Sequence, residues 1–178
     1  MTTKQIIQKG FTLIELIIAL AVASIIGIAA TMTAHNVITI PAMSNDSNTA
    51  VNQVRSAVNW INRDVQGADP DTIIDSPGTP GFFSISLQEW DSGTLSWSEH
   101  TITYSLEDMT GTSLKELWRD YDSNTSSSLI AQYIEPEAAG ITECSWDAVN
   151  SVFTITITAT VGYETETRTI QVKPRPTT

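Results

Sequence analysis

The 178-residue sequence has few of the residues that build covalent cross-links or metal centres. Cys144 is the single cysteine, so no disulfide can form within the chain. The two histidines, His35 and His100, lie far apart in the sequence, and a zinc site is therefore not expected. No nucleophile-elbow, zinc-protease or phosphate-loop motif is present. The sequence thus gives no indication of an enzyme of these classes, and no cofactor is expected.

Basic residues are scarce as well, with nine Lys and Arg against twenty Asp and Glu. Lys4 and Lys9 stand in the first ten residues, which leaves residues 11–178 with a net charge of about −13. Nucleic-acid binding requires a basic surface, so no nucleic-acid partner is expected. The acidic balance favours a soluble exterior, or a partner that presents a basic face.

Charge of either sign is missing from residues 16–45, and residues 16–30 are strongly apolar. A helix needs about 20 such residues to cross a bilayer core, and in lipid only a helix satisfies its own backbone. We therefore expect residues 11–40 to form a membrane-spanning helix. Lys4 and Lys9 precede this segment and no basic residue follows before Arg55, which predicts a single pass with residues 1–10 in the cytoplasm and the rest outside.

The sequence K-G-F-T-L-I-E-L occupies residues 9–16, directly before the apolar run. A carboxylate inside a spanning helix costs about 2.5–3.5 kcal/mol at mid-bilayer, so Glu15 needs a partner that neither a signal peptide nor a plain signal anchor supplies. The stretch resembles the leader of type IV prepilins. That resemblance implies cleavage between Gly10 and Phe11, methylation of Phe11, and pairing of Glu15 with the new N-terminus of a neighbouring subunit.

Residues 41–68 are predicted to form the amphipathic half of the same helix. Pro41 is expected to interrupt the helix, Ser44 or Asp46 to cap its new start, and Gly67 to end it. Apolar residues recur there at steps of three and four: Val51, Val54, Val58, Ile61 and Val65, widened by Ala57 and Trp60.

Residues 69–178 change to a period of two, which is typical of strands. The clearest alternation lies at residues 83–87, 102–106 and 153–161, and a turn at Gly162-Tyr163 leads to a returning strand at 167–172. Weaker strands are predicted at residues 114–120, 129–134 and 141–146. The expected fold is α+β and pilin-like, with a long N-terminal helix packed on an antiparallel β-sheet and residues 69–178 as a β-rich globular head.

A looser resemblance extends beyond the leader. The pattern I-N-R-D-V-Q-G-A at residues 61–68 and the strand Leu117-Trp118-Arg119 resemble J-type minor pilins of type II secretion pseudopili, which have relatives in type IV pili. Met32 stands where major pilins usually have a proline, and the carboxylate of Glu15 disfavours the K-type tip pilin.

The resemblance implies a structural minor pilin that helps to initiate or cap filament assembly. Its partners would be other pilin subunits and the prepilin peptidase/methyltransferase, and its location the inner membrane and then an extracytoplasmic filament. Two alternatives remain open: a major or adhesive pilin that displays a binding head, and a signal-anchored enzyme or sensor.

Asp120, Asp122 and Asn124 occupy the first three ligand spacings of a calcium loop. Thr125 stands in place of the required glycine and Ala131 in place of the closing acid, which excludes an EF-hand. A looser oxygen-ligand calcium site at these three residues is a weak candidate, and solvated turn residues are the alternative.

The five tryptophans could form a ligand platform, although in a small domain most should pack in the core. Trp90 and Trp97 lie in a polar region expected to be a loop and are the two expected to be exposed. Cys144 falls in an expected strand with Thr142 and Trp146 on its face, which indicates a small buried apolar side chain.

Overall fold

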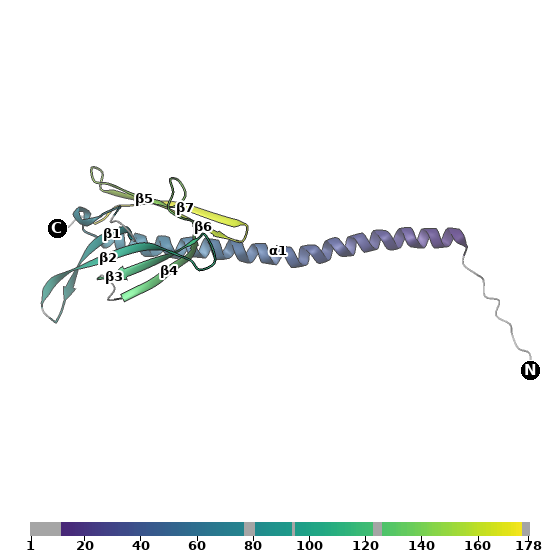
Figure 1. The fold of residues 1–178 in the computed structure, drawn as a ribbon, viewed down its shortest axis with the longest axis horizontal. Coiled ribbons are helices and arrows are strands. Elements are labelled where there is room, and N and C mark those ends of the chain that lie inside the picture. Colours follow the sequence, from purple (N-terminus) through teal and green to yellow (C-terminus); the bar gives the residue numbers. More distant parts are fainter. Residues whose placement is uncertain (1–11, 77–80, 94, 123–125, 176–178) are drawn as a thin grey trace, which may run out of the picture. The chain divides into compact units, whose positions relative to one another are not determined.

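The computed structural model describes residues 12–76, 81–93, 95–122 and 126–175. The chain divides into two compact units, Met1–Ala42 and Met43–Thr178. The described residues form one long helix, α1 (Leu13–Gly67), and an antiparallel sheet of seven strands (Figure 1). The α+β fold class predicted from the sequence is confirmed.

α1 continues through residue 41, so the expected break at Pro41 and new start at Ser44 or Asp46 are wrong. A proline inside a helix removes one hydrogen bond and crowds one carbonyl, at a cost of about 3 kcal/mol. The other hydrogen bonds of this 55-residue helix are not affected by that loss. The helix ends at Gly67 as predicted, and a short 3-10 helix, η1 (Pro70–Thr72), follows it.

The strands follow η1 in the order β1 (Gly81–Asp91), β2 (Ser96–Asp108), β3 (Lys115–Tyr121), β4 (Ser126–Ile134), β5 (Glu143–Asp147), β6 (Val152–Val161) and β7 (Glu164–Val172). β1 to β4 form a meander, and β6 pairs with both β5 and β7. The two groups join through β4 and β6 at the single residue pair Ile134↔Ala159. Each strand lies where the sequence predicts one, but β1 and β2 are longer, so Trp90 and Trp97 lie in strands rather than in a loop.

Within the head, α1 runs between the β1–β4 group and the β5–β7 group (Figure 1). Its apolar stripe is buried as predicted, with Val54, Ile61 and Val65 at most 1% exposed. The stripe packs against buried side chains from both groups of strands, among them Phe83, Ile85, Ile102, Tyr104, Leu117, Ile134, Phe153, Ile155 and Ile157. One core therefore joins the helix to both parts of the sheet.

Polar residues of α1 also bond to β4 near its junction with β6. Ser56 Oγ donates to the carbonyl oxygen of Ile130 at 2.9 Å, and the amide of Gln132 donates to Gln53 Oε1 at 2.8 Å. Backbone groups that no neighbouring strand pairs need other partners. Side chains of the helix therefore supply hydrogen-bond partners to backbone groups of β4 near the place where the two groups of strands join.

Candidate functional site

The first turn of α1 is closed by its own side chains. Thr12 donates to Glu15 Oε2 from its amide at 3.1 Å and from its hydroxyl at 2.9 Å. The amide of Glu15 in turn donates to Thr12 Oγ1 at 3.4 Å. This reciprocal pattern is a capping box, which satisfies amide groups that have no partner within the helix. Gly10 and Phe11, the expected cleavage-site residues, lie outside the described residues.

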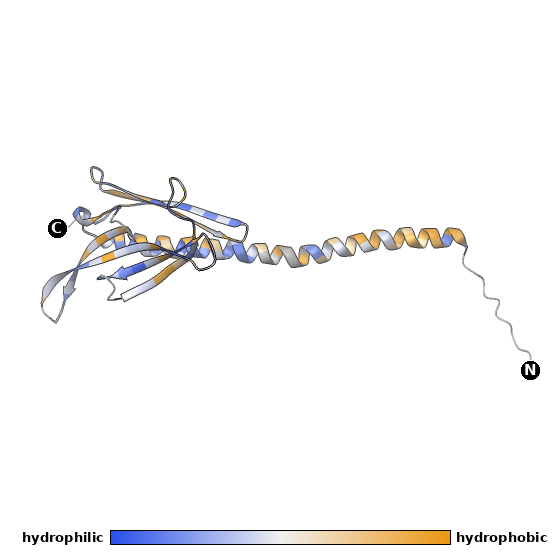
Figure 2. Cartoon of the chain, in the orientation of Figure 1, coloured by the Kyte–Doolittle hydropathy of each residue, from blue (hydrophilic) through white to orange (hydrophobic). Residues whose placement is uncertain are grey.

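The helix that follows is apolar and unburied. Leu13–His35 comprises 23 residues with a mean hydropathy of 2.6, which is long and apolar enough to cross a membrane, and Figure 2 shows the hydrophobic colouring along this half of α1. Its large side chains, such as Ile14, Ile17 and Ile25, are more than half exposed. Apolar surface of this extent requires lipid or other apolar helices around it.

Hydroxyl side chains within this segment bond to their own helix. Ser24 Oγ donates to the carbonyl of Ala21 at 2.7 Å, Thr31 Oγ1 to that of Gly27 at 2.8 Å, and Thr33 Oγ1 to that of Ala29 at 2.9 Å. These groups need no water or partner chain. They are therefore compatible with an apolar environment.

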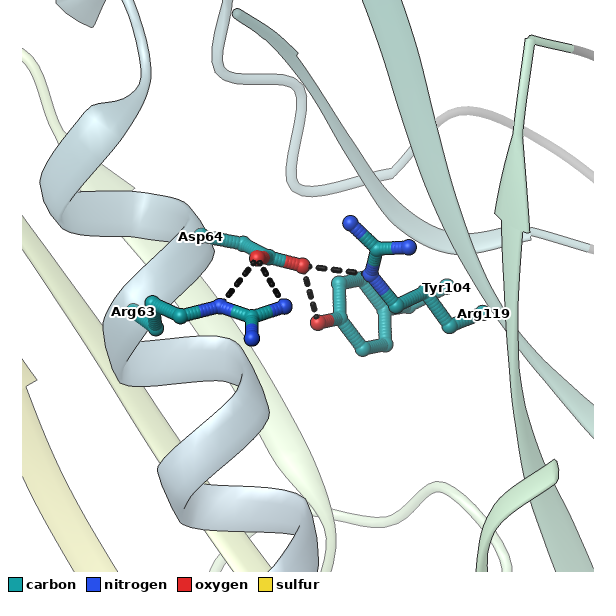
Figure 3. A network of polar contacts seen from close by, with 4 residues as sticks. All are labelled: Arg63, Asp64, Tyr104 and Arg119. Carbon is teal, nitrogen blue, oxygen red and sulfur yellow. Dashed lines mark hydrogen bonds and ion pairs between the residues drawn. The ribbon is translucent and has the colours of Figure 1, made fainter. Parts of the chain in front are cut away.

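The head contains a second polar centre, at the buried face of α1 (Figure 3). Asp64 is 4% exposed by side chain, and its Oδ2 accepts from Tyr104 Oη at 2.8 Å and from Arg119 Nε at 2.6 Å. Its Oδ1 accepts from Nε and Nη2 of Arg63 at 3.3 and 3.2 Å. One carboxylate of the helix is thus bonded to β2 through Tyr104 and to β3 through Arg119.

Burial and charge act together on the groups around Asp64. Burial raises the pKa of the Tyr104 phenol, and the neighbouring Asp64 carboxylate raises it further. Burial lowers the pKa of the Arg119 guanidinium, but the hydrogen bond and charge of Asp64 more than offset this, and the net shift is upward. Tyr104 therefore remains a protonated donor and Arg119 a cation, which is what a fixed structural contact requires.

Arg63 is the exposed member of this group, with 61% of its side chain accessible. Its guanidinium carbon lies 3.9 Å from the ring centroid of Trp60, a cation–π geometry. Arg119 also lies over Trp60, at 5.3 Å. Because the donors and the acceptor are occupied by one another, we interpret the cluster as a connection between helix and sheet rather than a reactive site.

The weak calcium candidates are only partly described, because Asn124 lies outside the described residues. Asp122 pairs with His100 Nδ1 at 2.7 Å and accepts from the Thr101 amide at 2.9 Å; the His100 contact first, and then the Thr101 contact, hold the pKa of Asp122 below its usual range. Asp120 Oδ1 is buried and bonds to no other described residue. Among the described residues, no group of three or more His, Cys, Asp or Glu is placed to hold a metal ion.

Cys144 lies in β5, and its thiol donates weakly to the carbonyl oxygens of Asp75 and Phe82, at 3.4 and 3.5 Å. Burial, together with the nearby carboxylates of Asp75, Glu137 and Glu143, raises the pKa of this thiol to about 12. A thiol that stays protonated is a poor nucleophile and a poor metal ligand.

Two of these contacts were not predicted from the sequence. The T-x-x-E spacing of Thr12 and Glu15 is a capping-box signature that could have been recognised. Asp64 lies beside Val65, on the apolar face of the helix. A carboxylate on a buried face must be paired, so its position predicts a buried partner. The partners of Asp64 could not be predicted, because the sequence does not reveal the register of β2 and β3.

Comparison with known proteins identifies the N-terminal segment. The family model described as the prokaryotic N-terminal methylation motif matches residues 7–31. The chain thus carries a type IV prepilin-like leader, which is a feature of structural rather than catalytic proteins. Together with the apolar helix Leu13–His35, the motif fits anchoring in the inner membrane. No curated protein and no solved structure matches the chain.

Proposed function

We propose that this chain is a structural pilin or pseudopilin subunit, cleaved after Gly10, methylated at Phe11 and assembled through its apolar helix. The observation that carries the proposal is the methylation motif at residues 7–31, which runs directly into the unburied helix Leu13–His35. In the membrane, lipid surrounds this helix; in a filament, helices of other subunits replace the lipid. The leader resides in the cytoplasm and the head outside.

Glu15 has a dual role in this proposal. In the single chain both hydrogen bonds from Thr12 end on Oε2, and no described residue bonds to Oε1. Cleavage after Gly10 creates an ammonium group at Phe11, and Oε1 can accept from that group on a neighbouring subunit. A buried pair of opposite charges is satisfied only when both partners are in place, so this contact sets the axial register of subunits.

The finer proposal is a minor subunit, resembling the J type, that helps to initiate or cap a type II secretion pseudopilus or a type IV pilus. It is supported by Met32, where major pilins usually have a proline, and by the similarity at residues 61–68 and at Leu117-Trp118-Arg119. A scarce subunit in sheared filaments supports a minor role. An abundant one favours the second candidate, a major or adhesive pilin.

The assembly role is tested with Glu15→Leu, using Thr12→Val as the matched control. We expect Glu15→Leu to be processed normally but absent from sheared filaments, because the new amino group then lacks its partner. Thr12→Val removes one hydroxyl of the cap and keeps the carboxylate, so it should assemble. If the chain were a signal-anchored enzyme or sensor, Glu15→Leu should have no effect. Normal assembly of that variant would contradict the proposal.

A further inference from the structure

The β1–β2 hairpin extends beyond the rest of the sheet. β2 pairs with β3 only from Ile102 to Asp108, whereas β1 and β2 remain paired as far as Asp91↔Ser96. Residues 88–93 and 95–100, here named the β1–β2 arm, therefore form a two-stranded ribbon past the edge of β3 (Figure 1). The base of the arm contacts the end of β3, where Tyr121 Oη donates to Glu89 Oε2 at 2.9 Å and His100 Nδ1 lies 2.7 Å from Asp122 Oδ2. The outer part, with Trp90 and Trp97, extends beyond these contacts. A two-stranded ribbon alone is only marginally stable in water, so the side chains of this outer part require a specific explanation.

Two indoles occupy one face of the arm. Trp90 and Trp97 are directly paired across the strands, with ring centroids 5.5 Å apart and an interplanar angle of 68°. They are 48% and 65% exposed, and Leu95 at the end of the arm is exposed as well. Edge-to-face packing orients the two rings while leaving much of their surface accessible. Large apolar side chains gathered in this way mark an interaction surface.

The charges of the arm indicate what binds there. Glu89, Asp91 and Glu99 are exposed, and the arm contains no Lys or Arg. Alternation along the strand places Glu99 on the face of Trp97 and Glu89 on the opposite face. The faces of indole rings attract cations, and a neighbouring carboxylate strengthens that attraction. The net negative charge of the whole chain also attracts a basic partner.

We propose that the β1–β2 arm docks a basic segment of a partner protein, with Lys or Arg side chains over Trp90 and Trp97 and a charge contact to Glu99. The inference goes beyond the pilin proposal and does not depend on cleavage or assembly. A sugar ring could also stack flat on the two indoles, but its binding would not need the carboxylates. Dependence of binding on Glu99 and on salt therefore distinguishes a basic segment from a sugar.

The test measures fluorescence anisotropy of a labelled eight-residue Lys/Arg peptide with the full-length chain in uncharged detergent micelles. We expect saturable, salt-sensitive binding, weakened at least about tenfold by Trp90→Ala/Trp97→Ala because two cation–π contacts are lost. Glu99→Gln should weaken binding a few-fold and reduce its salt dependence. Glu107→Gln, which removes an exposed charge of β2 outside the arm, is the matched control and should bind as the natural chain does.

Trp90→Phe/Trp97→Phe keeps an aromatic ring at each position, with a smaller surface and a weaker attraction for cations, and should bind with intermediate affinity. A cooperative unfolding transition at the same urea concentration as the natural chain establishes that the head of each variant is folded. The proposal is overturned if the natural chain does not bind the basic peptide, if the double alanine variant binds it equally well, or if an acidic peptide or a neutral oligosaccharide binds better.

Discussion

Replacing Asp64 by alanine tests the connection between α1 and the sheet. The substitution leaves the buried Tyr104 hydroxyl without its acceptor, which costs about 1–3 kcal/mol. It also leaves Arg119, 14% exposed by side chain, without its counter-charge, and loss of one partner of a buried ion pair costs about 3–5 kcal/mol. The two losses overlap and Arg119 retains some solvent, so we expect the free energy of unfolding to fall by about 4 kcal/mol.

The assay is urea unfolding of the purified chain in a mild detergent, followed by tryptophan fluorescence. Arg63→Ala is the control, since it removes an exposed partner of the same carboxylate and should cost only about 0.5 kcal/mol. In Asp64→Leu/Arg119→Met both charges are replaced by apolar groups, and it should be more stable than Asp64→Ala. Equal effects of Asp64→Ala and Arg63→Ala, or a loss below about 1 kcal/mol for Asp64→Ala, would refute the reasoning.

Two further predictions concern the head. An added Cβ at Gly162, where φ is +60°, would lie 2.5 Å from Oδ2 of Asp46. The Asp46 carboxylate would have to move, so Gly162→Ala should lower the melting temperature slightly more than Gly111→Ala, whose φ of +82° is similar but whose surroundings are open. Asp46→Ala should remove that difference, and its persistence would contradict the clash. Because the pKa of Cys144 is raised from 9.0 to about 12, its modification by iodoacetamide at pH 8 should be about 10³-fold slower than in urea, and should accelerate as the pH rises; comparable rates would contradict this.

Much of the fold is readable from the sequence because the apolar residues recur periodically, although the burial of Thr156 and Thr158 on the other face of β6 was not predicted. Ile155 and Ile157 alternate with threonines in β6, and Val54, Val58 and Ile61 recur at helical spacing in α1, so their buried faces could be predicted. The end of the helix at Gly67 and the turn between β6 and β7 were predicted correctly from local residue preferences.

The failures of prediction have physical causes of their own. Proline disfavours a helix locally, but α1 continues through residue 41 because the helical hydrogen bonds before and after it outweigh that cost. Strand ends could not be predicted in the β1–β2 arm, because a two-stranded ribbon exposes both faces and loses the alternation of burial. Asp64 and Arg119 lie 55 positions apart, and their contact depends on strand register rather than on any local signal.

The leader gives the most specific information in the chain, and the structure adds the capping contact between Thr12 and Glu15. This contact begins α1 within two residues of the proposed cleavage site. The helix is therefore already formed at the end where subunits would pair.

The most direct test of the central claim is the intact mass of the protein extracted from membranes that contain a prepilin peptidase. The account predicts the mass of residues 11–178 plus one methyl group of about 14 Da on Phe11. Replacing Gly10 by valine should leave the full-length mass. An uncleaved natural chain, or a chain cut within the apolar helix near residues 29–34 as a secretory signal peptide would be, would contradict the account.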